Sequence, residues 1–178
     1  LTRLINGLIP HYYNGQLTGQ IYLDGKEVKD YQLYQIAPMV GSVFQNPRTQ
    51  FYNVDTTSEI VFGCENLGLP VQEMLARLEN TTKCLKLENL LGRSLFALSG
   101  GEKQRIAVAR IKLLHRQVIL ADEATSALDD RYCEEVLNYL LTPELTVLAV
   151  SHDPRLIERF PVILKVKDHT LQQCGDRI

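Results

Sequence analysis

Two short apolar runs in the second half of the chain, 118–121 and 145–150, constrain its fold most strongly. Each is long enough for one buried strand, and helix-like stretches over 102–115 and 131–141 precede them. Parallel strands need long crossover connections, which helices usually supply, so this alternation is typical of a parallel sheet covered by helices. The sequence therefore predicts an α/β fold.

The first part of the chain predicts further pieces of this core. A helix is expected over 1–9, because Pro10 cannot continue it. Alternating apolar residues over 19–25 end on Asp-Gly and indicate a strand with a hairpin turn. Another strand is expected over 40–44.

The middle of the chain differs in character. After Pro70, apolar residues recur at three- and four-residue steps, which indicates an amphipathic helix in a small helical lobe. A short helix after Pro154 and strands over 162–166 and 170–173 close the chain. The predicted organisation is an N-terminal part of the core (1–52), the helical lobe (53–97) and, over 98–178, the helix expected over 102–115 with the C-terminal core.

Composition excludes several classes of protein. The chain is 45% hydrophobic and 22% charged, which argues against intrinsic disorder. Its net charge of -2 argues against a nucleic-acid binder that relies on charge. No apolar run approaches the roughly 20 residues that cross a bilayer. The four cysteines form no CxxC pair, so we expect free thiols and no zinc site.

Polar side chains follow three of the expected strands. Asp122 and Glu123 follow the run over 118–121, His152 follows the next strand, and Gln45 follows the strand over 40–44. Parallel sheets bind ligands at the carboxyl ends of their strands, where one carboxylate could hold Mg²⁺ through water and the other could activate a water. From these residues alone, two alternative interpretations remain: the carboxylate pair could be a solvated acidic turn, and His152 could have a structural role.

A diglycine is the strongest local signal. Ser99, Gly100 and Gly101 open the helix expected over 102–115, and a helix N-terminus favours phosphate. The alternative is a capping loop in which Ser99 is the cap. Asp129 lies shortly after the carboxylate pair and by itself indicates only a turn or cap.

In this order and spacing, the motifs resemble the ATP-binding cassette (ABC) family of ATPases. Gln45 matches the glutamine loop of that family, and His152 matches its switch histidine. Residues 98–104 match the signature sequence, 118–123 the Walker B strand with its catalytic glutamate, and 126–129 the loop that follows. The resemblance implies a P-loop NTPase-like parallel sheet flanked by helices, with an inserted helical lobe.

The resemblance also implies the cofactors, ATP and Mg²⁺, and the role of each strand-end residue. Glu123 would polarise the hydrolytic water, and His152 would contact the γ-phosphate. Gln45 would sense the metal and the γ-phosphate, and Asp122 would help to place the metal.

The remaining motif residues imply a dimer. Ser99, Gly100 and Gly101 would bind ATP held by an opposite ATPase subunit, and Asp129 would cross the same interface. The active unit would then be a head-to-tail homo- or heterodimer with ATP between its subunits.

One expected motif is missing. The phosphate-binding P-loop, GxxxxGK[ST], does not occur in the 178 residues. We expect truncation just after this Walker A motif, with the upstream strands also absent. These residues alone are therefore expected to be inactive.

Residues 4–10, 43–51 and 59–68 are similar to energy-coupling-factor importers. This similarity predicts a transport-coupled ATP hydrolase, peripheral on the cytoplasmic face of the membrane, that drives uptake of a vitamin or metal ion through integral membrane subunits. No nucleic-acid partner is expected. Glu123-Ala124-Thr125 is instead typical of exporters, and a degenerate partner that only lends its signature face is the third hypothesis.

Overall fold

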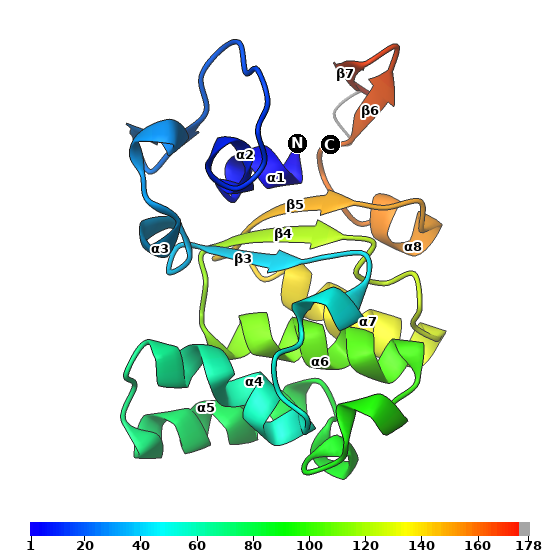
Figure 1. Ribbon diagram of the computed structural model, residues 1–178. Coiled ribbons are helices and arrows are strands. Elements are labelled where there is room, and N and C mark those ends of the chain that lie inside the picture. The colour runs from blue at the N-terminus through cyan, green and yellow to red at the C-terminus, as the bar shows by residue number, and fades with distance from the viewer. Residues whose placement is uncertain (175–178) are drawn as a thin grey trace.

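A three-stranded parallel sheet lies at the centre of the computed structural model, which describes residues 1–174 (Figure 1). Its strands are β3 (Val40–Val43), β4 (Val118–Asp122) and β5 (Thr146–Val150), paired in that order. Val43 pairs with Ala121, and Asp122 pairs with Val150. The carboxyl ends of all three strands therefore meet at one edge, and the predicted α/β fold is confirmed.

Two helices cover one face of this sheet: α6 (Gly100–Leu113) and α7 (Asp130–Leu140) (Figure 1). Both were predicted to within two residues. Helix α6 is buried on nearly every side, because the sheet lies above it and further helices lie below it. Its interior position explains why the sequence of α6 is not strongly amphipathic.

The helices below α6 are α4 (Thr56–Asn66) and α5 (Val71–Cys84), joined to it by the short 3₁₀ turns η3 (Glu88–Leu90) and η4 (Leu95–Ala97) (Figure 1). The helix after Pro70 was predicted from the sequence. Helix α4 was not predicted as a separate element. The division of the chain at 52/53 and 97/98 remains a prediction.

The N-terminal segments pack on the opposite face of the sheet. The single helix predicted over 1–9 is wrong, because Gly7 adopts a left-handed φ of 76° and separates α1 (Thr2–Ile5) from α2 (Leu8–His11). The predicted hairpin is confirmed, with Asp24 and Gly25 at positive φ in its turn. Its strands are β1 (Tyr22–Leu23) and β2 (Lys26–Glu27), followed by η1 (Val28–Asp30), α3 (Leu33–Ile36) and, after β3, η2 (Pro47–Gln50).

The hydrophobic core has two parts, one on each face of the sheet. The larger part joins the strands to α4, α5, α6 and α7 and includes Ile60, Ile106, Ile119 and Leu137. The smaller part lies under the N-terminal segments and includes Leu120. Strand β5 was expected to be buried, yet its residues are half-buried or exposed, whereas β3, which also lies at an edge of the sheet, is mostly buried.

The chain closes with α8 (Pro154–Ile157) and an exposed antiparallel hairpin of β6 (Leu164–Lys167) and β7 (Thr170–Gln173). All three elements were predicted. Among the helices of residues 1–174, none is long and apolar enough to cross a membrane.

Candidate functional site

The structure brings the predicted strand-end residues to one edge of the sheet. Asp122 ends β4, and Glu123 follows it directly. Gln45 lies two residues beyond β3, and His152 lies two residues beyond β5. Because these strands are neighbours and run in parallel, the amide, the carboxylates and the imidazole come from adjacent strand ends.

Glu123 is fixed by contacts to the neighbouring strand end. Its backbone N–H donates to the Val150 carbonyl at 2.8 Å, and its Oε1 accepts from the His152 N–H at 3.1 Å. Its φ of 52° is left-handed, which costs a non-glycine residue about 1 kcal/mol or more. Such strain persists only where surrounding contacts hold it, and it is concentrated at functional sites.

The two titratable side chains of this edge differ in exposure. The Glu123 side chain is 13% exposed, whereas that of His152 is 99% exposed. Glu123 Oε1 and His152 Nε2 are 4.0 Å apart. A fixed carboxylate beside a free imidazole can accept a proton from a water and let the imidazole contact a ligand above it.

Sequence reasoning missed the side chain that anchors the His152 segment. Asp153 accepts hydrogen bonds from Thr125 Oγ1 at 2.9 Å and from Arg155 Nε and Nη2 at 2.9 and 2.8 Å. The Arg155 guanidinium, helped by Thr125, lowers the pKa of Asp153 to about 2 against the cost of burial. The available signal was the Asp-Pro pair that begins α8.

The signature residues form a separate part of the molecule, at the start of α6. Ser99 Oγ accepts from the Glu102 N–H at 3.2 Å, and Glu102 Oε2 accepts from the Ser99 N–H at 2.7 Å. This capping box lowers the pKa of Glu102, chiefly through the Ser99 N–H. The capping role considered for Ser99 is therefore present, and next to it Gly100 is exposed whereas Gly101 is half-buried.

Gly101 packs against the loop that follows the carboxylate pair. A Cβ atom at Gly101 would lie 2.7 Å from the Ala127 carbonyl oxygen, whereas one at Gly100 would meet no atom within 4 Å. Asp129 caps α7 by accepting from the Tyr132 N–H at 3.1 Å. The absence of a side chain at Gly101 thus lets α6 pack directly against residues 126–129, here called the Asp129 loop.

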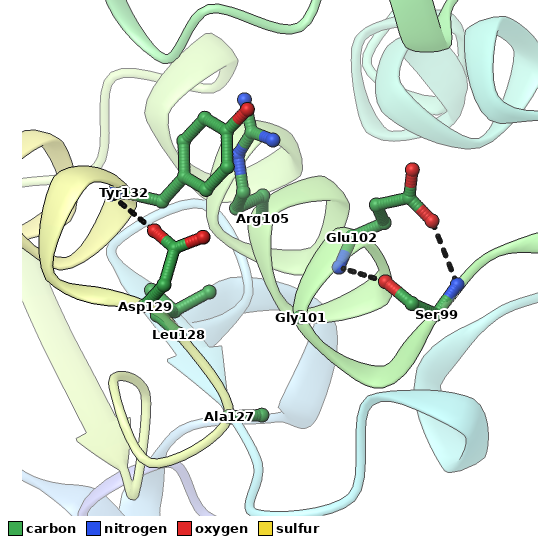
Figure 2. Close-up of a pocket in the computed structure, with 8 residues that line it drawn as sticks. All are labelled: Ser99, Gly101, Glu102, Arg105, Ala127, Leu128, Asp129 and Tyr132. Atoms are coloured by element: carbon green, nitrogen blue, oxygen red, sulfur yellow. Dashed lines mark hydrogen bonds between the residues drawn. The ribbon is translucent and has the colours of Figure 1, made fainter.

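A hollow of about 290 Å³ lies between these segments (Figure 2). The Arg105 guanidinium lies 3.5 Å from the centre of the Tyr132 ring and donates to the Leu85 carbonyl at 2.7 Å. The hollow is lined by Ser99, Gly101, Glu102, Arg105, Ala127, Leu128, Asp129 and Tyr132. Gln45, Asp122, Glu123 and His152 do not line it, so the structure presents two distinct polar surfaces.

The strand-end edge suits a hard cation only in part. No group of three or more His, Cys, Asp or Glu side chains in residues 1–174 could hold a metal ion. Mg²⁺, however, is commonly held by one or two protein oxygens together with phosphates and water. Asp122, at the end of β4, and Gln45, just beyond the neighbouring β3, offer oxygens that suit that mode of binding.

Comparisons of sequence place this chain among ABC proteins. A family model described as "ABC transporter" matches residues 1–126. A protein of Treponema denticola named "Putative ABC transporter ATP-binding protein" is 44% identical over 155 residues, which are 85% of this chain and 32% of that protein. The chain thus spans about a third of that relative. Energy-coupling factor transporter ATP-binding protein EcfA1 of Ligilactobacillus salivarius is 37% identical over 157 residues, covering 86% of this chain and 54% of that protein.

Solved structures share the fold. The structure of cbiO1 from Clostridium perfringens, described as part of the ABC transporter complex cbiONQ, matches with a TM-score of 0.78 at 25% identity. That match covers 96% of this chain and 69% of the other. A dimeric ATP-binding cassette described as bound to ADP and Pi matches with a TM-score of 0.81 over 97% of this chain and 78% of the other. At 22% identity, this second match speaks for the fold alone.

The family model covers well over half of the chain. The strand-end motif residues lie at the ends of adjacent parallel strands, and the diglycine lies at the start of α6. The chain therefore belongs to the ABC transporter family.

Proposed function

We propose that the protein is a nucleotide-binding subunit of an ABC transporter and hydrolyses ATP to drive transport. One observation carries this proposal: Glu123 is held in a left-handed conformation against His152, where three parallel strands end. A fixed carboxylate next to a free imidazole suits the activation of a water beside a phosphate.

Each strand-end residue has a task in this mechanism. The Glu123 carboxylate orients the attacking water and accepts its proton. His152, which projects into solvent, reaches the γ-phosphate and fixes it in line with that water. Asp122 and Gln45 supply oxygens for Mg²⁺, which neutralises phosphate charge when it is bound.

The hollow between the start of α6 and the Asp129 loop, here called the signature hollow, is proposed to complete the nucleotide site of a second ATPase subunit. The start of α6 offers N–H groups and the positive end of the helix dipole to phosphate. Ser99, Gly100 and Gly101 would contact a nucleotide held by the partner, and Asp129 would face that partner. This arrangement accounts for the separation of the hollow from the strand-end edge.

The finer proposal is an importer of the energy-coupling-factor type for a vitamin or metal ion, with this chain at the cytoplasmic face of the membrane. Two similarities support it: the relative named EcfA1 and the solved cbiO1, which is described as part of an ABC transporter complex. Integral membrane subunits would carry the substrate, and this chain would dock on them as a peripheral subunit.

The test is ATP turnover by the full-length protein and its Glu123→Gln variant. Loss of the carboxylate removes the proton acceptor, so kcat should fall about 100-fold or more while nucleotide binding persists. Glu144→Gln is the matched control, since Glu144 is an exposed carboxylate next to the start of β5. Turnover by Glu123→Gln that equals the control would contradict the proposal, and a wild type without turnover would favour a degenerate partner subunit.

A further inference from the structure

A buried carboxylate on α4 lies next to the segment that carries Gln45. Glu59 is fully buried, although charged residues are seldom buried without a partner. Its Oε2 accepts hydrogen bonds from the backbone N–H groups of Tyr52 and Asn53, at 2.9 and 2.8 Å, and from Asn53 Nδ2 at 3.1 Å. One side chain thus holds two consecutive residues of the segment between β3 and α4.

The same carboxylate also reaches the signature helix. Glu59 Oε1 lies 2.9 Å from Arg110 Nη1, and the Arg110 side chain is 19% exposed. Arg110 Nη1 further donates to the Gln50 carbonyl at 2.6 Å. The pair therefore connects three elements: the segment after Gln45, helix α4 and helix α6, which lies between α4 and the sheet in Figure 1.

Gln50 extends this connection back to the end of β3. With its amide oriented so that both its oxygen and its nitrogen are satisfied, Gln50 donates to the Ser42 carbonyl at 3.1 Å and accepts from the Phe44 N–H at 2.8 Å. The loop over 45–50 is thus closed at its base, and Gln45 is its first residue. A shift of Gln50 relative to α6 would move the base from which Gln45 extends.

We propose that Glu59 is a positioning residue, which through Arg110 sets the place of Gln45 relative to the signature helix α6. This inference rests on the proposed function, in which Gln45 contacts the metal and the γ-phosphate. Gln45 belongs to the strand-end edge, and Ser99 belongs to the hollow at the start of α6. The Glu59–Arg110 pair joins the segment after Gln45 to helix α6. Glu59 itself touches neither surface.

Glu59→Gln tests this role because it keeps the size of the side chain. The new NH₂ group would face either Arg110 or the N–H groups of Tyr52 and Asn53, which sets donor against donor. In the full-length protein we expect kcat for ATP to fall about tenfold with KM changed less than about threefold. Hydrogen exchange at the amides of Tyr52 and Asn53 should become faster in either orientation, because a neutral amide replaces the charged carboxylate that accepts their hydrogen bonds.

Thr56→Val is the matched control on the same helix. Thr56 is also fully buried, and its hydroxyl donates to the Leu90 carbonyl at 2.6 Å, away from the Gln45 segment. Thr56→Val removes a buried hydrogen bond of α4, so it should lower the stability of the protein without the fall in kcat expected for Glu59→Gln. If Glu59→Gln fails to fold, Arg110→Lys keeps the charge but not the paired contact, and should lower kcat in the same direction.

The outcomes separate this inference from the proposed function. A selective fall in kcat together with faster exchange at Tyr52 and Asn53 supports it. A kcat equal to that of Thr56→Val, or unchanged exchange at both amides, overturns it. If the wild type shows no ATP turnover, the proposed function fails, and the exchange measurement still decides whether Glu59 holds the segment.

Discussion

At the scale of single residues, the carboxylate of Asp153 holds the segment that carries His152, because it accepts hydrogen bonds from Thr125 and Arg155. The anchor at Asp153 depends on contacts with Thr125 and with Arg155 that only the folded chain creates. Such side-chain networks leave no periodic pattern in a sequence, so they escape analysis of the sequence alone.

Asp153 should make stability depend on pH. Its pKa is lowered from 3.8 to about 2, so its ionised form stabilises the folded state above about pH 4, and this stabilisation is lost as pH falls towards 2. Asp153→Asn should therefore cost about 2 kcal/mol near neutral pH, and the difference from wild type should shrink below about pH 4. Thermal unfolding midpoints over this pH range measure the effect.

Asp24→Asn is the control for this measurement, because Asp24 lies exposed in a hairpin turn at a φ of 49°, which asparagine also tolerates. It should match the wild type at each pH. A constant difference between Asp153→Asn and wild type over the whole range would show that the ionised form of Asp153 has no special role.

At the scale of elements, the regularity of the apolar pattern in the sequence decided which helices and strands could be predicted. Helix α5 was expected because its apolar residues repeat at three- and four-residue steps, and β4 and β5 were expected from compact apolar runs. The helix over 1–9 was wrong because one glycine at positive φ outweighs the apolar residues around it. Burial of β5 was overestimated, because the apolar run in the sequence does not reveal which other segments cover the strand.

The contact between α6 and the Asp129 loop gives a paired prediction. Gly101→Ala would place a Cβ 2.7 Å from a backbone oxygen of Ala127, so α6 or the loop must shift, at a cost of about 1–3 kcal/mol. Gly100→Ala meets no atom within 4 Å and should change stability by less than about 1 kcal/mol. Denaturant unfolding of both variants checks this, and equal stabilities would contradict the packing described for Gly101.

At the scale of the whole molecule, the fold follows from local patterns joined by one topological rule. The prediction that polar residues from distant parts of the chain share an edge required only that the strands be parallel and adjacent, and they are. The signature hollow could not be foreseen as a cavity, because it arises where the start of α6 meets the Asp129 loop. The proposed dimer rests on the observation that the strand-end residues do not line this hollow.

The most direct test of the account is a structure of the full-length Glu123→Gln protein with Mg-ATP, in which turnover is blocked. We expect the γ-phosphate beside Gln45, Asp122 and His152 of one ATPase subunit, with the signature segment of the other subunit closing the site; in a homodimer this segment is Ser99 to Gly101 of the second copy. A nucleotide bound away from the strand-end edge, with these three side chains facing solvent, would contradict the account.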